Sequence, residues 1–221
     1  MTNRSFFFAG GGTGGHIYPA IAVAEQILKL APEAKIHFFC SDRDIDERIF
    51  SSVGGDVAFE YTRLPAKSFS MGWGKSIDFC SCFIKSYRTA KRIIFDSYNP
   101  VIVGVGGYVA VPVCLAGYRL NKPIILLNVD MVPGRANRII SRWAKDIFVQ
   151  FEDSMNYFAG CGGKVSVVGC PLRGQFNNPD CSKVIQRLKL DEHKKILLIT
   201  GASSGSEHIN EAICLLCSNQ S

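Results

Sequence analysis

The stretch that decides the fold begins at Ser5 and reads SFFFAGGGTGGH as far as His16. Its aromatic and apolar start predicts a short buried β-strand, and a run of glycines follows at once. Residues 18–30 then place apolar side chains at the spacing of one helix face. A strand, a glycine turn and a helix in this order predict the first half of a βαβ unit.

The same alternation continues along most of the chain. Further apolar runs predict strands at residues 34–40, 56–64, 101–103, 124–128, 146–150 and 164–168. Amphipathic stretches between them predict helices at residues 42–53, 76–97, 109–120 and 135–143. Strands that alternate with helices imply an α/β fold with a parallel sheet covered on both faces.

A change of composition marks a boundary near residue 170. Residues 170–180 (CPLRGQFNNPD) are rich in Pro, Gly and Asn, which favours a linker. Beyond it we expect a helix at 181–190, a strand at 195–200, a glycine turn at 201–205 and a helix at 207–217. About forty residues are too few for a stable domain. We therefore expect a first domain at 1–169 and, at 181–221, the incomplete start of a second βαβ domain. The alternative is that 181–221 docks onto the first domain.

The composition narrows the class of protein. The chain has 221 residues, 47% hydrophobic and 20% charged, a balance that excludes a disordered or collagen-like chain. Its net charge of +6 suits anionic partners such as nucleotides, phosphates or acidic lipids, and is too small to indicate nucleic acid binding. No apolar run approaches the ~20 residues of a membrane-spanning helix. The N-terminus lacks the pattern of a signal peptide, so we expect a cytoplasmic protein.

Nine cysteines are scattered along the chain. A disulfide framework is typical of short secreted proteins, which this chain does not resemble. Cys80 with Cys82, and Cys214 with Cys217, do not form the two pairs with zinc spacing that a structural site usually needs. We therefore expect buried apolar thiols rather than a metal site.

The first glycine turn has the chemistry of an anion site. Glycines let a ligand approach the backbone closely, and the helix behind them exposes unpaired N–H groups and a partial positive charge. Gly10, Gly12 and Gly15 also satisfy G-x-G-x-x-G, and Asp42 stands near the end of the second strand. A dinucleotide-binding site is therefore an alternative, although GGGTGGHxxP is a narrower pattern than that motif.

Two further glycine turns follow strands, at residues 104–107 and 201–205. Ligands of open α/β sheets bind at the carboxyl ends of strands, so the first two turns are expected to face one crevice. His16 directly follows the first turn, where a neutral imidazole is able to take a proton from a hydroxyl nucleophile. A hydrogen bond to the loop is the alternative role. Arg173 has forked donors that suit a phosphate or carboxylate.

These motifs resemble those of one family. GGGTGGHIYPAIAVA, GVGGYVAVP, VPGRAN, GCPLR and GASSGSEHIN occur in the same order as in the MurG-type glycosyltransferases. The members of that family are UDP-N-acetylglucosamine:lipid I N-acetylglucosaminyltransferases of peptidoglycan synthesis. The resemblance covers nearly all of this chain and only the first part of the family's length. It implies a GT-B architecture, in which two Rossmann-like domains enclose the active site in a cleft.

The resemblance assigns roles residue by residue. His16 is similar to the family's loop histidine, a candidate catalytic base. The remaining matches imply substrate contacts. Thr13, Gly14 and Gly15 match the glycine-loop residues of the donor site, and Tyr108 lies in the turn that faces the acceptor. Arg173 matches the arginine after the last strand of the first domain, and Ser203 matches a serine near the donor phosphates.

One part of the pattern departs from the family. Residues 127–130 read LNVD where the family has His-Glu-Gln-Asn. Asp130 therefore stands in place of an asparagine expected near the sugar. An ionised aspartate accepts hydrogen bonds and does not donate one, so the residue alone leaves open whether the donor sugar is the family's or another one.

The implied reaction moves N-acetylglucosamine from UDP-N-acetylglucosamine to a lipid-linked pyrophosphate acceptor, with inversion and without a metal or other cofactor. The implied location is the cytoplasmic face of the cell membrane, with peripheral attachment. Residues 69–94 mix aromatic and basic side chains, which suits a membrane surface. The family's uridine pocket lies beyond the matched part, so we expect a missing domain or partner to complete the site, and little activity from this chain alone. An NAD(P)-binding oxidoreductase and a non-enzymatic acceptor-binding subunit of a split GT-B enzyme are the alternatives.

Overall fold

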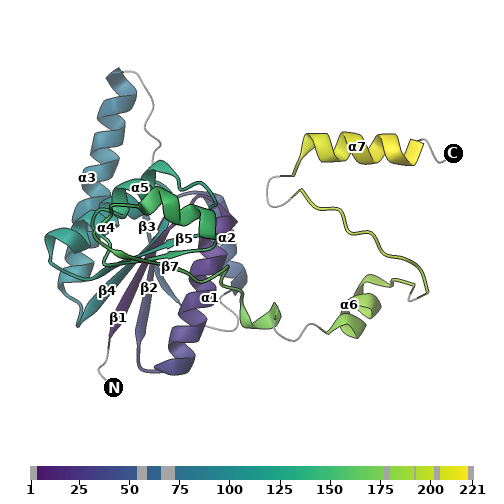
Figure 1. The fold of residues 1–221 in the computed structure, drawn as a ribbon, viewed down its shortest axis with the longest axis horizontal. Helices are drawn as coiled ribbons and strands as arrows, with labels where there is room; N and C mark the ends of the chain where they lie inside the picture. The colour runs from purple at the N-terminus through teal and green to yellow at the C-terminus, as the bar shows by residue number, and fades with distance from the viewer. Residues whose placement is uncertain are drawn as a thin grey trace. The chain divides into compact units, whose positions relative to one another are not determined.

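The computed structural model describes residues 4–53, 59–65, 73–176, 180–191, 193–201 and 205–218, and within them seven strands pair into one parallel sheet. The order across the sheet is β3-β2-β1-β4-β5-β6-β7 (Figure 1). The strands are β1 (Ser5–Gly10), β2 (Lys35–Ser41), β3 (Glu60–Leu64), β4 (Pro100–Gly106), β5 (Ile124–Asn128), β6 (Asp146–Val149) and β7 (Lys164–Val167).

Helices cover both faces of this sheet (Figure 1). One apolar core lies under α1 (Gly14–Leu30) and α2 (Asp44–Val53). The other lies under α3 (Trp73–Phe95), α4 (Ala110–Arg119) and α5 (Arg135–Ile140). Side chains alternate along a strand, so Phe7 of β1 joins the second core and its neighbour Phe8 the first. The parallel α/β fold predicted from the sequence is therefore confirmed.

The chain changes direction across the sheet between β1 and β4. From β1 it proceeds outward to β2 and β3, and from β4 it proceeds the other way to β7. At such a switch point the connections after the two central strands lead to opposite faces and leave a crevice at the carboxyl ends. The two glycine turns that follow β1 and β4 lie at this crevice.

The structure corrects some boundaries. α1 begins at Gly14, about one turn before the expected start, so Pro19 lies inside the helix and not in its first turn. The helix opens with Gly14, Gly15 and His16, none of which carries an apolar side chain, so the apolar spacing marked the start too late. A short 3₁₀ helix, η1 (Glu152–Phe158), follows β6 where no element was predicted. Residues 56–58 of the expected third strand lie outside the described residues.

The chain divides into two units, Met1–Phe176 and Asn177–Ser221. The second unit contains α6 (Cys181–Leu188) and α7 (Glu207–Ser218). Asp180 caps α6, because its carboxylate accepts a hydrogen bond of 3.0 Å from the Lys183 N–H. The described part of this unit buries none of its helical side chains.

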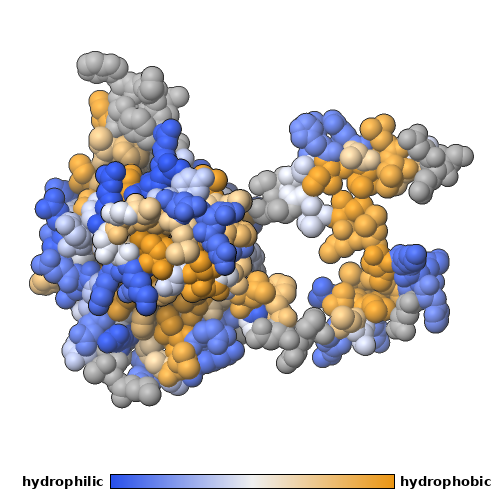
Figure 2. All heavy atoms as spheres, in the orientation of Figure 1, coloured by the Kyte–Doolittle hydropathy of each residue, from blue (hydrophilic) through white to orange (hydrophobic). Residues whose placement is uncertain are grey.

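The expected strand at residues 195–200 does not form. The described residues 193–201 contain no strand, because a strand is stable only when its backbone groups pair with a neighbour, and β1 to β7 all belong to the first unit. Leu197 and Leu198 are 74% and 84% exposed. Figure 2 accordingly shows hydrophobic surface along the segment that leads to α7.

Candidate functional site

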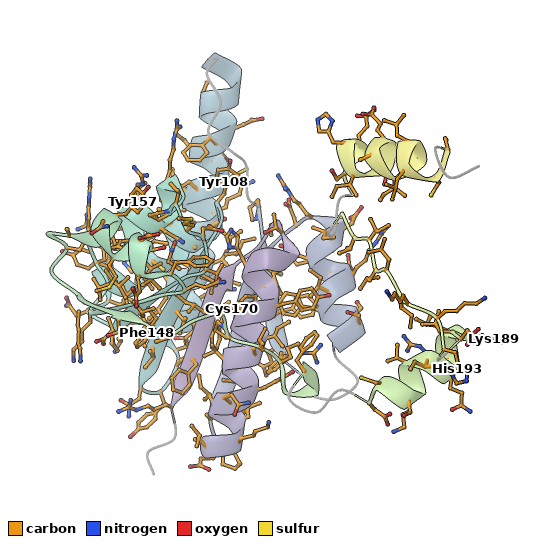
Figure 3. All side chains as sticks on the ribbon, turned by 45° about the vertical axis from the view of Figure 1, so that its right-hand side comes forward. Tyr108, Phe148, Tyr157, Cys170, Lys189 and His193 are labelled. Atoms are coloured by element: carbon orange, nitrogen blue, oxygen red, sulfur yellow. The ribbon has the colours of Figure 1, made fainter. Side chains whose placement is uncertain are left out.

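A cavity of about 690 Å³ opens at the carboxyl ends of β1, β2 and β4. The turn after β1 supplies Gly11, Gly12 and Thr13 to its lining, and the turn after β4 supplies Gly107 and Tyr108. Figure 3 labels Tyr108, which is 53% exposed. The prediction that the two glycine turns share one crevice is therefore confirmed.

The two glycine turns touch, and glycine is what permits it. Gly107 has a φ of +81°, and a Cβ there would lie 2.6 Å from the carbonyl oxygen of Gly11. Gly11 is equally confined, because its Cβ would meet the carboxylate of Asp46 and the Ser41 backbone nitrogen at 2.8 Å. A side chain at Gly107 forces the two turns apart, and one at Gly11 displaces the Asp46 carboxylate and the end of β2.

Asp46 holds the first glycine turn and was not predicted from the sequence. Its carboxylate is fully buried. It accepts hydrogen bonds from the Gly12 N–H at 2.9 and 3.1 Å, from the Ser41 N–H at 2.8 Å and from the Ser41 hydroxyl at 2.6 Å. The Gly12 N–H is therefore already engaged, which corrects the expectation that the whole turn is free to bind an anion.

His16 lines the cavity from the first turn of α1. Its Cε1 and Nε2 lie 3.0 and 3.2 Å from the point that a Cβ on Gly106 would occupy. Its Nδ1 is buried and has no hydrogen-bond partner. The imidazole thus packs its Cε1–Nε2 edge against the second glycine turn and forms part of the cavity lining.

Two asparagines fix the wall behind this histidine. Asn137 of α5 donates to Oδ1 of Asn128 at 2.9 Å, and Asn128 donates to the Asp130 carbonyl oxygen at 2.6 Å. Asn137 and Asn128 are buried. The chain of donors ties the start of α5 to the end of β5. Asp130 itself is exposed and does not line the cavity.

Arg173 lies outside the cavity, in a contact that the sequence did not predict. Its Nε donates to Oε1 of Glu25 at 2.9 Å, and the two side chains are 14% and 13% exposed. The Gly174 N–H donates to the other Glu25 oxygen at 3.3 Å. Arg173 thus pairs with a carboxylate of α1. Gly14 and Gly15 form the first turn of α1 beside the cavity, and Ser203 lies outside the described residues.

The charge of the cavity is positive. Of the described residues that line it, Arg43 and Arg135 carry a permanent charge, and both are exposed. Arg43 also donates to the Gly12 carbonyl oxygen at 3.5 Å. Together with the N-terminus of α1, these side chains favour an anionic ligand.

All nine cysteines are free thiols, and they differ in burial, with Cys82 and Cys161 partly buried. Cys40 and Cys114 are buried as predicted; burial raises the pKa of Cys40 to about 12 and that of Cys114 further above its usual range. The prediction of buried thiols is wrong for Cys80, Cys170 (Figure 3), Cys181, Cys214 and Cys217, which are exposed. Among the described residues, no three potential ligands from His, Cys, Asp and Glu come together at a metal site.

A family model matches the part of the chain that builds this cavity. Residues 6–149 match the glycosyltransferase family 28 N-terminal domain. The chain belongs to glycosyltransferase family 28. In this family 28 chain the match runs from β1 to β6 and includes both glycine turns of the cavity.

The family 28 chain also has close curated relatives. It is 34% identical over 212 residues to the UDP-N-acetylglucosamine--N-acetylmuramyl-(pentapeptide) pyrophosphoryl-undecaprenol N-acetylglucosamine transferase of Caldicellulosiruptor saccharolyticus, covering 96% of this chain and 56% of the relative. It is 37% identical to the protein of the same name from Leuconostoc mesenteroides, covering 93% and 55%. The chain thus spans little more than half the length of these relatives.

Solved structures of low identity share the fold. MurG of Acinetobacter baumannii matches with a TM-score of 0.56 at 22% identity, over 74% of this chain and 44% of that one. UDP-GlcNAc 2-epimerase of Neisseria meningitidis, bound to UDP-GlcNAc, matches with a TM-score of 0.65 at 14% identity, over 99% and 63%. The GT-B type of α/β fold predicted for the family 28 chain is confirmed.

Family membership does not favour the two alternative functions. The oxidoreductase interpretation depended on Asp42 as the acid that binds a ribose. Asp42 is exposed and does not line the cavity, whereas the buried acid at this point, Asp46, binds the protein's own backbone. The family is one of glycosyltransferases, so a non-enzymatic subunit is not favoured either.

Proposed function

We propose that this chain is the acceptor-binding part of an enzyme that moves N-acetylglucosamine from UDP-N-acetylglucosamine to a lipid-linked pyrophosphate acceptor in peptidoglycan synthesis. The observation that carries the proposal is the cavity in which two glycine turns meet beside His16. The names of the relatives support the choice of substrates.

In this proposal His16 is the general base. A hydroxyl of the acceptor sugar forms the new bond to the anomeric carbon, and the bond from that carbon to UDP breaks with its electron pair leaving on UDP. The hydroxyl proton passes to an imidazole nitrogen of His16. Attack from the face opposite UDP inverts the anomeric carbon. A positioned base contributes rate because the proton leaves as the new bond forms.

The positive charge of the cavity supports binding of the acceptor's pyrophosphate, so the proposal moves Thr13, Gly14 and Gly15 from the donor site that the resemblance implies to the acceptor site. The N-terminus of α1 places the N–H groups of Gly14 and Gly15 beside the cavity, and Arg43 and Arg135 stand at its wall. Helix N-termini and guanidinium groups both favour phosphate oxygens. Thr13 and Tyr108 add hydroxyl groups to the same lining.

The outer face of α3 supports attachment to a membrane surface. Ile77 and Ile84 are 69% and 48% exposed, and they share a shallow surface with Lys85 and Arg88. Apolar side chains bordered by cations suit the anionic cytoplasmic face of a membrane. No helix in the described part of the chain is both long and apolar enough to cross a bilayer.

The donor side is the less complete part of the proposal. Residues 181–221 are proposed as the start of the nucleotide-sugar domain, with Ser203 near the donor phosphates and Arg173 and Asp130 near the donor. Arg173 has to leave Glu25, at least in part, to contact a phosphate. Because the chain spans about half of its relatives, we expect the uridine pocket to come from further protein sequence.

The proposal is tested by joining residues 1–221 to the remaining C-terminal part of the Leuconostoc mesenteroides relative. UDP release is then measured with the lipid-linked acceptor. The chain alone is expected to give little or no turnover, and the joined protein to be active. His16→Ala in the joined protein should lower kcat by about 10²–10⁴-fold.

A matched histidine gives the control. His193 is exposed and lies outside the cavity, so His193→Ala should leave kcat unchanged. Near-normal turnover in His16→Ala would remove the role of base from His16. Activity of residues 1–221 alone would contradict the need for further sequence.

A further inference from the structure

The cavity beside His16 has two chemically different halves. The glycine turns with Arg43 and Arg135 form a polar, positive half. Facing it are apolar side chains from three helices: Phe79 and Phe83 of α3, Val111 of α4 and Ile139 of α5. A pyrophosphate needs the first half only, so the second half requires a separate explanation.

Two of the apolar side chains, Phe79 and Phe83, lie side by side. Phe79 and Phe83 are one helical turn apart, with ring centroids separated by 6.1 Å, and therefore lie on the same face of α3. Both rings are only half-buried, and Ile139 is 39% exposed. Apolar area that faces a concave site is stabilised when a hydrocarbon replaces the water against it.

The two halves belong to one cavity, so a ligand that fills both must join an anion to a hydrocarbon. A volume of about 690 Å³ lies within the range of pockets that enclose a small ligand. In the proposed acceptor the lipid chain is attached directly to the pyrophosphate. A pyrophosphate at the glycine turns therefore places the first carbons of its chain in the same cavity as the side chains of α3.

We propose that the apolar half binds the first isoprene units of the acceptor's lipid carrier, so that the protein, and not only the bilayer, holds the start of the chain. This inference rests on the proposed function, because it takes the acceptor to be a polyprenyl pyrophosphate. It adds Phe79, Phe83 and Ile139 as residues that recognise the carrier.

This lipid subsite is separate from the face of α3 that suits a membrane. Phe79 and Phe83 line the cavity, whereas Ile77 and Ile84 line a different, shallow surface on the same helix. Residues four apart, such as Phe79 and Phe83, share one side of a helix, whereas residues two apart, such as Ile77 and Phe79, do not. Variants of the two pairs therefore separate chain binding from adsorption to lipid.

The test measures equilibrium binding to residues 1–221 by isothermal titration calorimetry, with monomeric farnesyl diphosphate and inorganic pyrophosphate as probes. Burial of several carbons is expected to make farnesyl diphosphate bind at least about tenfold more tightly than pyrophosphate. Equal affinities would overturn the lipid subsite while leaving the anion site in place. Failure of both probes to bind would overturn the proposed function together with the subsite.

Substitutions of the lining residues locate the bound hydrocarbon chain of the probe. Phe79→Ser/Phe83→Ser, and independently Ile139→Ser from another helix, should remove the advantage of farnesyl diphosphate and leave the affinity for pyrophosphate unchanged. Phe79→Leu/Phe83→Leu should keep most of it, which guards against loss of fold. The matched control is Phe95→Ser, because Phe95 lies on the same helix, is 72% exposed and does not line the cavity.

Ile77→Ser/Ile84→Ser separates the two apolar faces of α3. It should lower adsorption to anionic vesicles and leave farnesyl diphosphate binding unchanged. If this pair, or Phe95→Ser, weakens farnesyl diphosphate binding as much as the cavity variants do, the binding is non-specific adsorption and the proposal is wrong.

Discussion

Residues 5–30 and residues 195–218 have the same order of features in the sequence: an apolar run, a glycine turn and an amphipathic helix. In the first case the run becomes β1, paired on one side with β2 and on the other with β4. In the second case the helix α7 forms, while the run before it forms no strand and its two leucines stay exposed. A helix satisfies its own backbone and a strand does not, so only the strand depends on the rest of the domain.

The largest expected effect comes from truncating one leucine in each of the two units that contain these regions. Leu126→Ala removes a fully buried side chain from the core under α4, and should lower the free energy of unfolding by about 2–5 kcal/mol. Leu198 is 84% exposed, so Leu198→Ala should change it by less than about 0.5 kcal/mol. Urea denaturation measures both. A loss above about 2 kcal/mol for Leu198→Ala would mean that the segment is buried in solution, and the contrast would fail.

A smaller effect separates a glycine turn of the first unit from a glycine turn of the second unit. Gly107 and Gly205 both have positive φ angles, +81° and +74°, but a Cβ on Gly107 would lie 2.6 Å from Gly11, whereas one on Gly205 meets nothing within 4 Å. Gly107→Ala therefore adds a steric clash to the backbone strain that both variants share. It should lower Tm by about 4–8 °C, against less than about 2 °C for Gly205→Ala. If calorimetry gave equal shifts of Tm for the two variants, Gly107 would not contact the turn of Gly11.

The smallest effect concerns the cap of α6. A hydrogen bond from the Lys183 N–H, followed by one from the Lys183 side chain, lowers the pKa of Asp180 from its ordinary value. The cap is therefore fully present above the ordinary aspartate pKa of about 3.9 and is lost as the pH falls through the lower folded pKa. Amide exchange at Lys183 should accelerate in that acid window relative to Asp180→Asn, because asparagine caps a helix without titrating. The same acceleration in Asp180→Asn would assign the change to another group.

Local pattern was enough to predict most of the first unit. The strands and helices follow from hydrophobic spacing, and the glycine turns after β1 and β4 follow from topology, because parallel strands end at one edge. Thr13, His16 and Tyr108 could be placed at one cavity for that reason. The outcome at residues 195–200 was not predicted, since spacing does not report whether a neighbouring strand exists.

The contacts that hold the site together were beyond sequence reasoning. Asp46 is separated from Gly12 by 34 residues, and Arg173 from Glu25 by 148. Many charged side chains offer such contacts, and only the fold selects among them. An acid was expected at the end of β2, and the sequence motif indicated Asp42. Nothing in the spacing indicates that the first turn of α2 folds back and places Asp46 on the glycine turn.

The ion pair of Glu25 and Arg173 joins α1 to the segment that follows β7. Glu25 belongs to the same helix as His16. The ion pair therefore connects the chain that follows β7 to the helix whose first turn carries the imidazole. Helices are stiff along their axes. Residues 174–176, which follow Arg173, thus begin at a point held to the same helix whose first turn carries His16.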